Sequence, residues 1–159
     1  YTISINFMWR VIFKTALLAG TLDIIAAFIQ SYLTNNTTPS RVLQFVASGV
    51  FSTSAFTGST VMLVWGLFFH FSIAFSCTAC FFLVYPKIKV LSASWILNAV
   101  AIGIVAWCVT NLIIEPLSNT PKSPFNILKV PMGLSILIVC IGMPIAYYAK
   151  LFFQEKSKK

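Results

Sequence analysis

Charged side chains are scarce in this chain of 159 residues. Only 9% of the residues are charged and just three are acidic, whereas 58% are hydrophobic. Ordinary soluble domains carry about 25% charged residues. A soluble fold could not cover its surface with so few charges. The composition therefore predicts a polytopic membrane protein rather than a soluble domain.

Groups that carry chemistry are equally few. One histidine and three acidic residues make a thin inventory for catalysis, and neither a glycine-rich phosphate loop nor an accessible Ser/His/Asp set occurs. We therefore expect that the protein is not an enzyme. The net charge of +8 does not indicate nucleic-acid binding here, because the basic residues flank apolar runs. In such places they act as topology signals and contact anionic lipids.

The four cysteines all fall inside apolar runs, and not in the polar loops of a disulfide scaffold. Cys77 and Cys80 have CxxC spacing, but they lie in mid-helix rather than at a helix start, where redox-active CxxC motifs sit. No second Cys/His pair at matching depth completes a zinc site. A single histidine cannot supply both axial ligands of a b-type haem. We expect neither a metal nor a cofactor.

Four apolar runs are long enough to cross a membrane at about 20 residues each. We expect an all-α polytopic membrane protein with a single membrane domain over residues 1–159, and with a short helix after the first span. The expected spans are about 13–33, 59–85, 92–114 and 130–153, and the short helix is about 39–52. The two halves show no internal repeat, so the inverted-repeat architecture of many transporters receives no support.

The short helix has recognisable sequence signals. Thr38 suits its N-cap and Pro39 its first turn. Apolar residues fill one side of it, and the other side carries a polar stripe: Arg41, Gln44, Ser48 and Ser52. This pattern fits an interfacial helix or a re-entrant one that dips partway into the membrane. A helix packed on top of the bundle is the alternative.

The distribution of lysine and arginine predicts the orientation. With the N-terminus inside, three of the eleven basic residues lie on the outer face: Arg41, Lys122 and Lys129. The other eight lie on the cytoplasmic face: Arg10, Lys14, Lys87, Lys89, Lys150, Lys156, Lys158 and Lys159. We therefore expect both termini in the cytoplasm, with anionic lipids of the bilayer as partners at that face.

Two polar side chains fall near the middle of predicted spans. Asp23 and His70 each lie about 15 Å deep in a hydrocarbon core about 30 Å thick. A charged aspartate at the bilayer centre costs about 2.5–3.5 kcal/mol on insertion scales. Protonation, or a hydrogen bond to His70, would reduce that cost. Small residues flank both groups, which predicts that they face a helix interface rather than lipid: Ala19, Gly20, Ala26, Ala27, Gly66 and Ala74.

Two interpretations of this pair stay open. It is either a proton-responsive pair or relay, or a structural hydrogen bond that fixes two helices. Asn98 on the third span is able to join either network. Asn111 and Glu115 end the third span at the outer surface, where we expect Glu115 to be solvated.

Five phrases of the sequence occur in order and in register with a family pattern: AGTLDI (19–24), RVLQFVASG (41–49), GLFFHFSIA (66–74), YPKIKV (85–90) and NLIIEPLS (111–118). They resemble an uncharacterised family of small bacterial inner-membrane proteins with four predicted spans. The more distant YagU-like proteins are similar through the second and third spans. The resemblance covers roughly residues 16–145. It implies a location in the bacterial plasma membrane, and it implies no activity.

The family pattern also bears on site residues. It carries matching residues at five positions of this chain: Asp23, Arg41, Gln44, His70 and Asn111. The resemblance implies that Asp23, Arg41, Gln44 and His70 form one site. Ser48 and Gly49 would help the short helix to fold back over the first two spans. Glu115 departs from the pattern, which more usually has an apolar residue there.

Two functions from different classes fit these observations. The first is a non-catalytic accessory or structural subunit of a membrane assembly, which docks through small-residue helix faces onto other subunits or onto copies of itself. The second is a proton-linked small-solute carrier or channel-like oligomer, with Asp23 and His70 at its core.

Overall fold

The computed structural model describes residues 5–121 and 130–157. Within these ranges the chain is helical and four helices are long and apolar enough to cross a membrane: Asn6–Asn35, Thr60–Lys87, Trp95–Leu117 and Val130–Gln154. The expected all-α architecture with four potential spans is confirmed. The orientation depends partly on residues that lie outside the described ranges: Lys122, Lys129, Lys158 and Lys159.

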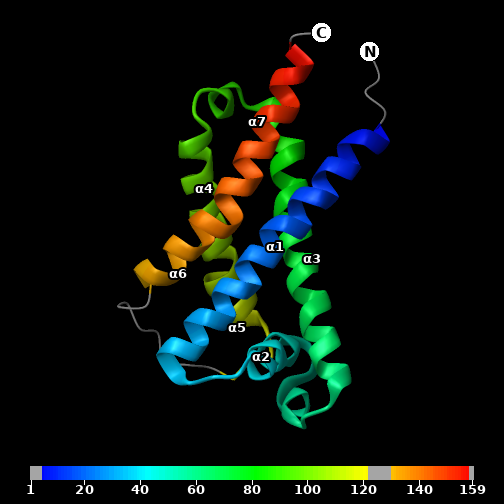
Figure 1. Ribbon diagram of the computed structural model, residues 1–159, viewed down its shortest axis with the longest axis vertical. Helices are drawn as coiled ribbons and strands as arrows, with labels where there is room; N and C mark the ends of the chain where they lie inside the picture. Colours follow the sequence, from blue (N-terminus) through cyan, green and yellow to red (C-terminus); the bar gives the residue numbers. More distant parts are fainter. Residues whose placement is uncertain (1–4, 122–129, 158–159) are drawn as a thin grey trace.

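The first two spans are α1 (Ile5–Asn35) and α3 (Thr60–Val84), and the last two are each built from three helical pieces. The third span comprises α4 (Trp95–Cys108), η4 (Val109–Ile114) and α5 (Glu115–Leu117). The fourth comprises α6 (Val130–Leu137), η6 (Ile138–Gly142) and α7 (Met143–Ser157). The first turn of α1 and the last turn of α7 lie at one end of the molecule, and α2 (Pro39–Phe51) lies at the other (Figure 1).

The α1 helix begins well before the expected span, because its first turns pack on the C-terminal helix. Phe7 stacks on Phe152 with ring centroids 5.9 Å apart, and Ile12 is fully buried. The main core continues from there through the fully buried Phe82 and Ile145.

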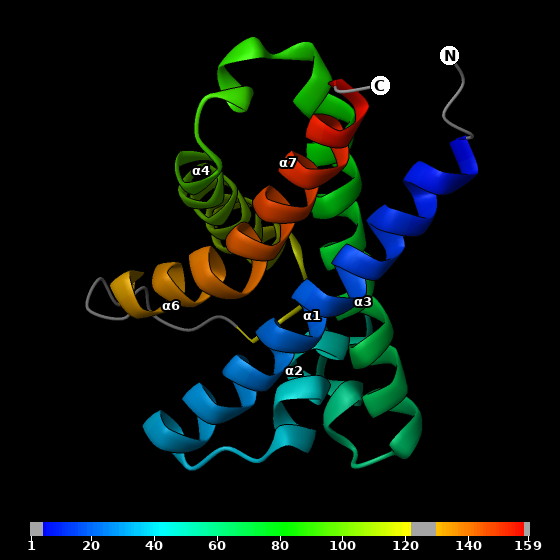
Figure 2. The same cartoon turned by 45° about the horizontal axis from the view of Figure 1, so that its top comes forward.

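The third and fourth spans each contain a π-helical segment, η4 and η6. Each segment precedes a proline, Pro116 or Pro144, whose missing N–H frees the carbonyl four residues earlier. Those carbonyls belong to Leu112 and Cys140, inside the two π-helical segments. At Pro144 the helix accommodates the proline through a π-turn, and the chain changes direction between α6 and α7 (Figure 2).

The short helix α2 packs across α3 at the end remote from the termini. The Thr38 side chain accepts a hydrogen bond from the Arg41 amide at 3.4 Å, as its capping role predicts. Gly66 permits the contact with α3, since a Cβ there would overlap the Leu43 carbonyl oxygen. Gly66 therefore lies at a helix interface, as expected, and the partner helix there is α2. A 3-10 turn, η1 (Ser52–Phe56), then leads the chain back towards α3.

Candidate functional site

A cavity of about 600 Å³ lies inside the helix bundle, between the middle of the spans and α2. Segments of α1, α2, α3 and both composite spans form its walls. The walls are mostly apolar, and they carry a set of polar side chains: Asp23, His70, Ser72, Ser76, Cys77, Thr110, Glu115, Ser118 and Thr120. Neither lysine nor arginine is among the described residues that line it.

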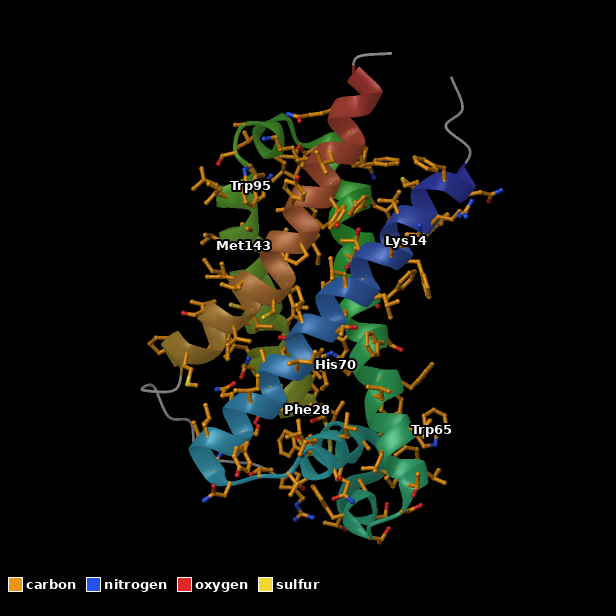
Figure 3. The ribbon with its side chains drawn as sticks, in the orientation of Figure 1. Lys14, Phe28, Trp65, His70, Trp95 and Met143 are labelled. Carbon is orange, nitrogen blue, oxygen red and sulfur yellow. The ribbon has the colours of Figure 1, made fainter. Side chains whose placement is uncertain are left out.

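Close contact between α1 and α3 places His70 at this cavity. Gly20 and Ala74 are buried where the two helices meet, and a Cβ on Gly20 would come within 2.8 Å of the Phe71 ring. His70 reaches across, so that its Nε2 lies 2.8 Å from the Gly20 carbonyl oxygen. Because a carbonyl oxygen only accepts, Nε2 carries the hydrogen of this bond. Figure 3 shows His70 between the two helices.

Asp23 follows on the same stretch of α1 and is half-buried. Its charge is close enough to His70, Cys77 and Cys140 to interact with them. Its carboxyl group, however, makes no hydrogen bond with any residue that the structure describes. A hydrogen bond to His70, one of the two ways to reduce the cost of the acid, is not found among the described residues: His70 Nε2 is engaged by the Gly20 carbonyl oxygen instead. The two side chains share the cavity without bonding each other.

The third span contributes Glu115, which the sequence placed in solvent and the structure places in the cavity wall. Thr110 and Glu115 are five residues apart, about 140° around an α-helix. The π-helical geometry of η4 between them brings both to the cavity. Ser118 donates a hydrogen bond to the Glu115 carbonyl oxygen at 2.9 Å.

A hydrogen bond ties this end of the third span to α2. The backbone N–H of Asn119 donates to the Gly49 carbonyl oxygen at 3.1 Å. Gly49 and its neighbours on α2 also form part of the cavity wall. The short helix is thereby held over the cavity from two sides, by α3 and by the end of the third span.

The two expected site residues on α2 lie elsewhere. Arg41 is exposed, with its guanidinium 4.2 Å from the centre of the Phe56 ring. Gln44 is buried in the helix and does not line the cavity. Neither side chain lines the cavity that Asp23 and His70 share.

The two expected amides on the third span also have local partners. Asn98 is buried, and its side chain donates to the Leu91 carbonyl oxygen at 2.5 Å. Asn111 donates to the Trp107 carbonyl oxygen within its own helix at 3.0 Å. Neither lines the cavity. Of the six predicted site residues, the structure brings only Asp23 and His70 together.

Several residues that line the cavity were not predicted from the sequence. Ser72 and Ser76 recur three and seven residues after Phe69, which is the spacing of one helix face. His70 lies about 100° around the helix from Phe69, so the spacing gave no link from His70 to these serines. Comparison with protein-family models, with curated proteins and with solved structures finds no match. The chemistry of the cavity must therefore be argued from its own residues.

Proposed function

We propose that this chain is a proton-linked carrier for a small solute, which binds in the cavity beside Asp23 and His70. The observation that carries the proposal is the exposure of both groups to one cavity within an otherwise apolar bundle. Ionisable residues inside a transmembrane bundle mark solute and proton pathways when they face such a space. A carboxyl group without a protein donor is able to exchange a proton or accept a solute.

The alternative is that the chain is an accessory subunit, and an experiment must distinguish this hypothesis from the carrier. Exposed apolar side chains along the spans fit both hypotheses, because lipid and a partner subunit each cover apolar surface. The cavity favours the carrier hypothesis, because it places an acid and an imidazole at a space large enough for a small solute.

Native mass spectrometry on protein gently extracted from its own membrane tests the proposal. We expect one protomer or a homo-oligomer with a retained small molecule, and loss of that molecule in Asp23→Asn. Thr21→Val is the matched control, because Thr21 lies on the same helix but bonds only the Leu17 carbonyl oxygen. A fixed-stoichiometry assembly with other chains and no retained solute would establish the accessory subunit instead.

Infrared spectroscopy provides a second readout of the proton. In a carrier, the carboxyl band assigned by Asp23→Asn should respond to bulk pH, because the proton must exchange with water through the cavity. A carboxyl group sealed inside a structural contact would show no such response.

We further propose a bacterial inner-membrane location with both termini in the cytoplasm, and α2 as a re-entrant helix near the outer face. The distribution of basic residues supports this orientation, and the family resemblance supports the bacterial location. In a cysteine-free background, Ser40→Cys should react with a membrane-impermeant maleimide in intact cells. Asn6→Cys should react only after permeabilisation. The reverse labelling pattern would show that both termini lie on the outer side of the membrane.

A groove near the start of α1 supports anionic phospholipid as a partner at the cytoplasmic face. Trp9, Arg10, Phe13 and Lys14 line it together with Phe75 of α3, whose ring stacks with Trp9 at 6.1 Å. Arg10 and Lys14 are four residues apart on one helix, where like charges repel. A phosphate headgroup between them would offset that repulsion, and the apolar walls suit an acyl chain.

A further inference from the structure

We infer that the solute of this cavity is a small apolar molecule that carries hydrogen-bond donors, N–H or O–H groups, on one side. The inference rests on the proposed function, which assigns the cavity but not the class of solute. The hydrogen-bonding atoms that the described wall keeps available for a solute are mainly acceptors, so the solute must bring the donors.

Two serines on α3 present such acceptors. Ser72 and Ser76 both line the cavity, and each donates its hydroxyl hydrogen to the backbone carbonyl oxygen four residues earlier, at 2.8 Å. A serine hydroxyl has one hydrogen and two lone pairs. Because the hydrogen is used inside the helix, each hydroxyl oxygen is left to accept from a solute. Residues four apart on a helix are neighbours, so the two acceptors lie one turn apart.

Asp23 adds a third acceptor from α1. It lines the same cavity, and its carboxyl group makes no hydrogen bond with any residue that the structure describes. A carboxyl group keeps at least one accepting oxygen whether it is charged or protonated. The match between this group and a donor on the solute therefore holds in both protonation states.

Donors are scarce among the described side chains of the wall. The Nε2–H of His70 is already donated to the Gly20 carbonyl oxygen, and Ser118 and Thr120 share a hydrogen bond with each other. Neither lysine nor arginine is among the described lining residues, and Thr110 contributes one hydroxyl. A carboxylate or phosphate solute would lose its hydrogen bonds to water here and gain too few in return.

The rest of the wall suits an apolar body. Phe45 of α2 and Phe69 of α3 lie among aliphatic side chains, and the volume of about 600 Å³ is within the range of small-molecule sites. A solute with many hydroxyl groups, such as a sugar, would leave most of them without partners. An apolar body with one donor group is the combination that satisfies both parts of the wall.

The test compares two uncharged isomers, 3,5-dimethylbenzamide and N,N-dimethylbenzamide. They contain the same atoms and the same carbonyl group, but only the first has N–H donors. The full chain in phosphatidylcholine nanodiscs is titrated by ligand-observed NMR, with empty nanodiscs as the baseline for partitioning into lipid. We expect saturable binding of the 3,5-isomer, about fivefold or more tighter than that of the N,N-isomer, which is the effect of one net hydrogen bond.

Variants of the serines assign the acceptors. Ser72→Ala combined with Ser76→Ala should remove most of the preference for the 3,5-isomer and leave binding of the N,N-isomer unchanged. Ser135→Ala is the matched control, because Ser135 makes the same type of bond, to the Pro131 carbonyl oxygen at 2.7 Å, but does not line the cavity. It should leave binding of both isomers unchanged.

The outcomes separate the two proposals. If the N,N-isomer binds as tightly as the 3,5-isomer, the donor inference is overturned; this comparison needs no variant to fold. A preference that survives loss of both serines overturns their role as acceptors. If neither isomer binds while the Asp23 band responds to pH and a solute is retained in native mass spectrometry, the inference fails and the carrier remains. If the band does not respond and no solute is retained, both fail.

Discussion

The contact between α2 and α3 at Gly66 gives the most direct test of how the cavity is covered. A Cβ at Gly66 would overlap the Leu43 carbonyl oxygen, and it would lie 2.8 Å from the carbonyl carbon and 3.1 Å from Cα. All three are backbone atoms, which cannot rotate away. Carbon atoms in good contact lie about 3.5 Å apart. In Gly66→Ala, α2 must therefore retreat by at least about 0.7 Å to clear the carbonyl carbon, and further to clear the oxygen.

The energetic cost of this retreat can be bounded. A gap of that size forfeits about a quarter to a half of the dispersion energy between facing atoms. Overpacking by one methyl group typically costs about 1–3 kcal/mol, which corresponds to a change of about 5- to 150-fold in an equilibrium. Because α2 forms one wall of the cavity, we expect Gly66→Ala to open the cavity to water more often.

The native thiol of Cys77, which lines the cavity, reports this opening. The assay measures its labelling rate with a small water-soluble maleimide after the other thiols are replaced by alanine: Cys80, Cys108 and Cys140. Labelling should be faster in Gly66→Ala than in the parent. The helical circular dichroism should be retained, because all four spans remain intact.

Gly133→Ala is the matched control within a span. A Cβ there would meet only the Trp107 side chain, at 3.7 Å, which is an ordinary contact. We expect its Cys77 labelling rate to equal that of the parent. Equal rates in Gly66→Ala and Gly133→Ala would refute the role of the α2–α3 contact in covering the cavity.

Two further predictions concern contacts on α1. His70→Leu removes the hydrogen bond to the Gly20 carbonyl oxygen and should lower the free energy of unfolding by about 0.6–1.7 kcal/mol; unchanged stability in a detergent titration would contradict this. Arg10→Gln with Lys14→Gln should weaken retention of phosphatidylglycerol in native mass spectrometry by about 30-fold, at about 1 kcal/mol per basic residue. Lys87→Gln, which is exposed and not part of the groove, should retain the lipid, and equal losses in both variants would show that only bulk charge matters.

The fold was largely predictable because membrane helices are signalled by length and composition. Each of the four apolar runs forms a helix long enough to cross the hydrocarbon core of a bilayer. The α2 helix has a capping threonine and a first-turn proline, which are local signals that need no tertiary context. The helical extension at the start of α1 was not predictable in this way. It depends on packing of Phe7 and Ile12 against the C-terminal helix, which a sequence pattern does not show.

The site was less predictable because it depends on departures from α-helical periodicity. The spacing of 3.6 residues per turn separates Thr110 from Glu115, and only the π-turn of η4 brings them to one cavity. Asn98 shows the converse limit. A buried amide in a span suggests a shared polar network, but a backbone carbonyl seven residues earlier in the chain satisfies it.

The sequence left two interpretations of Asp23 and His70 open, a structural hydrogen bond and a proton-responsive pair, and the structure gives the two residues different surroundings. His70 makes the interhelical hydrogen bond, and its partner is the backbone of α1 rather than the acid. A structural acid would accept hydrogen bonds from neighbouring groups, as the Gly20 carbonyl does from His70. Asp23 accepts none from the described chain and faces the cavity instead. A bare carboxylate at that depth costs about 2.5–3.5 kcal/mol, and the proposed carrier role reduces this cost, because a proton or a solute that enters the cavity would compensate the charge.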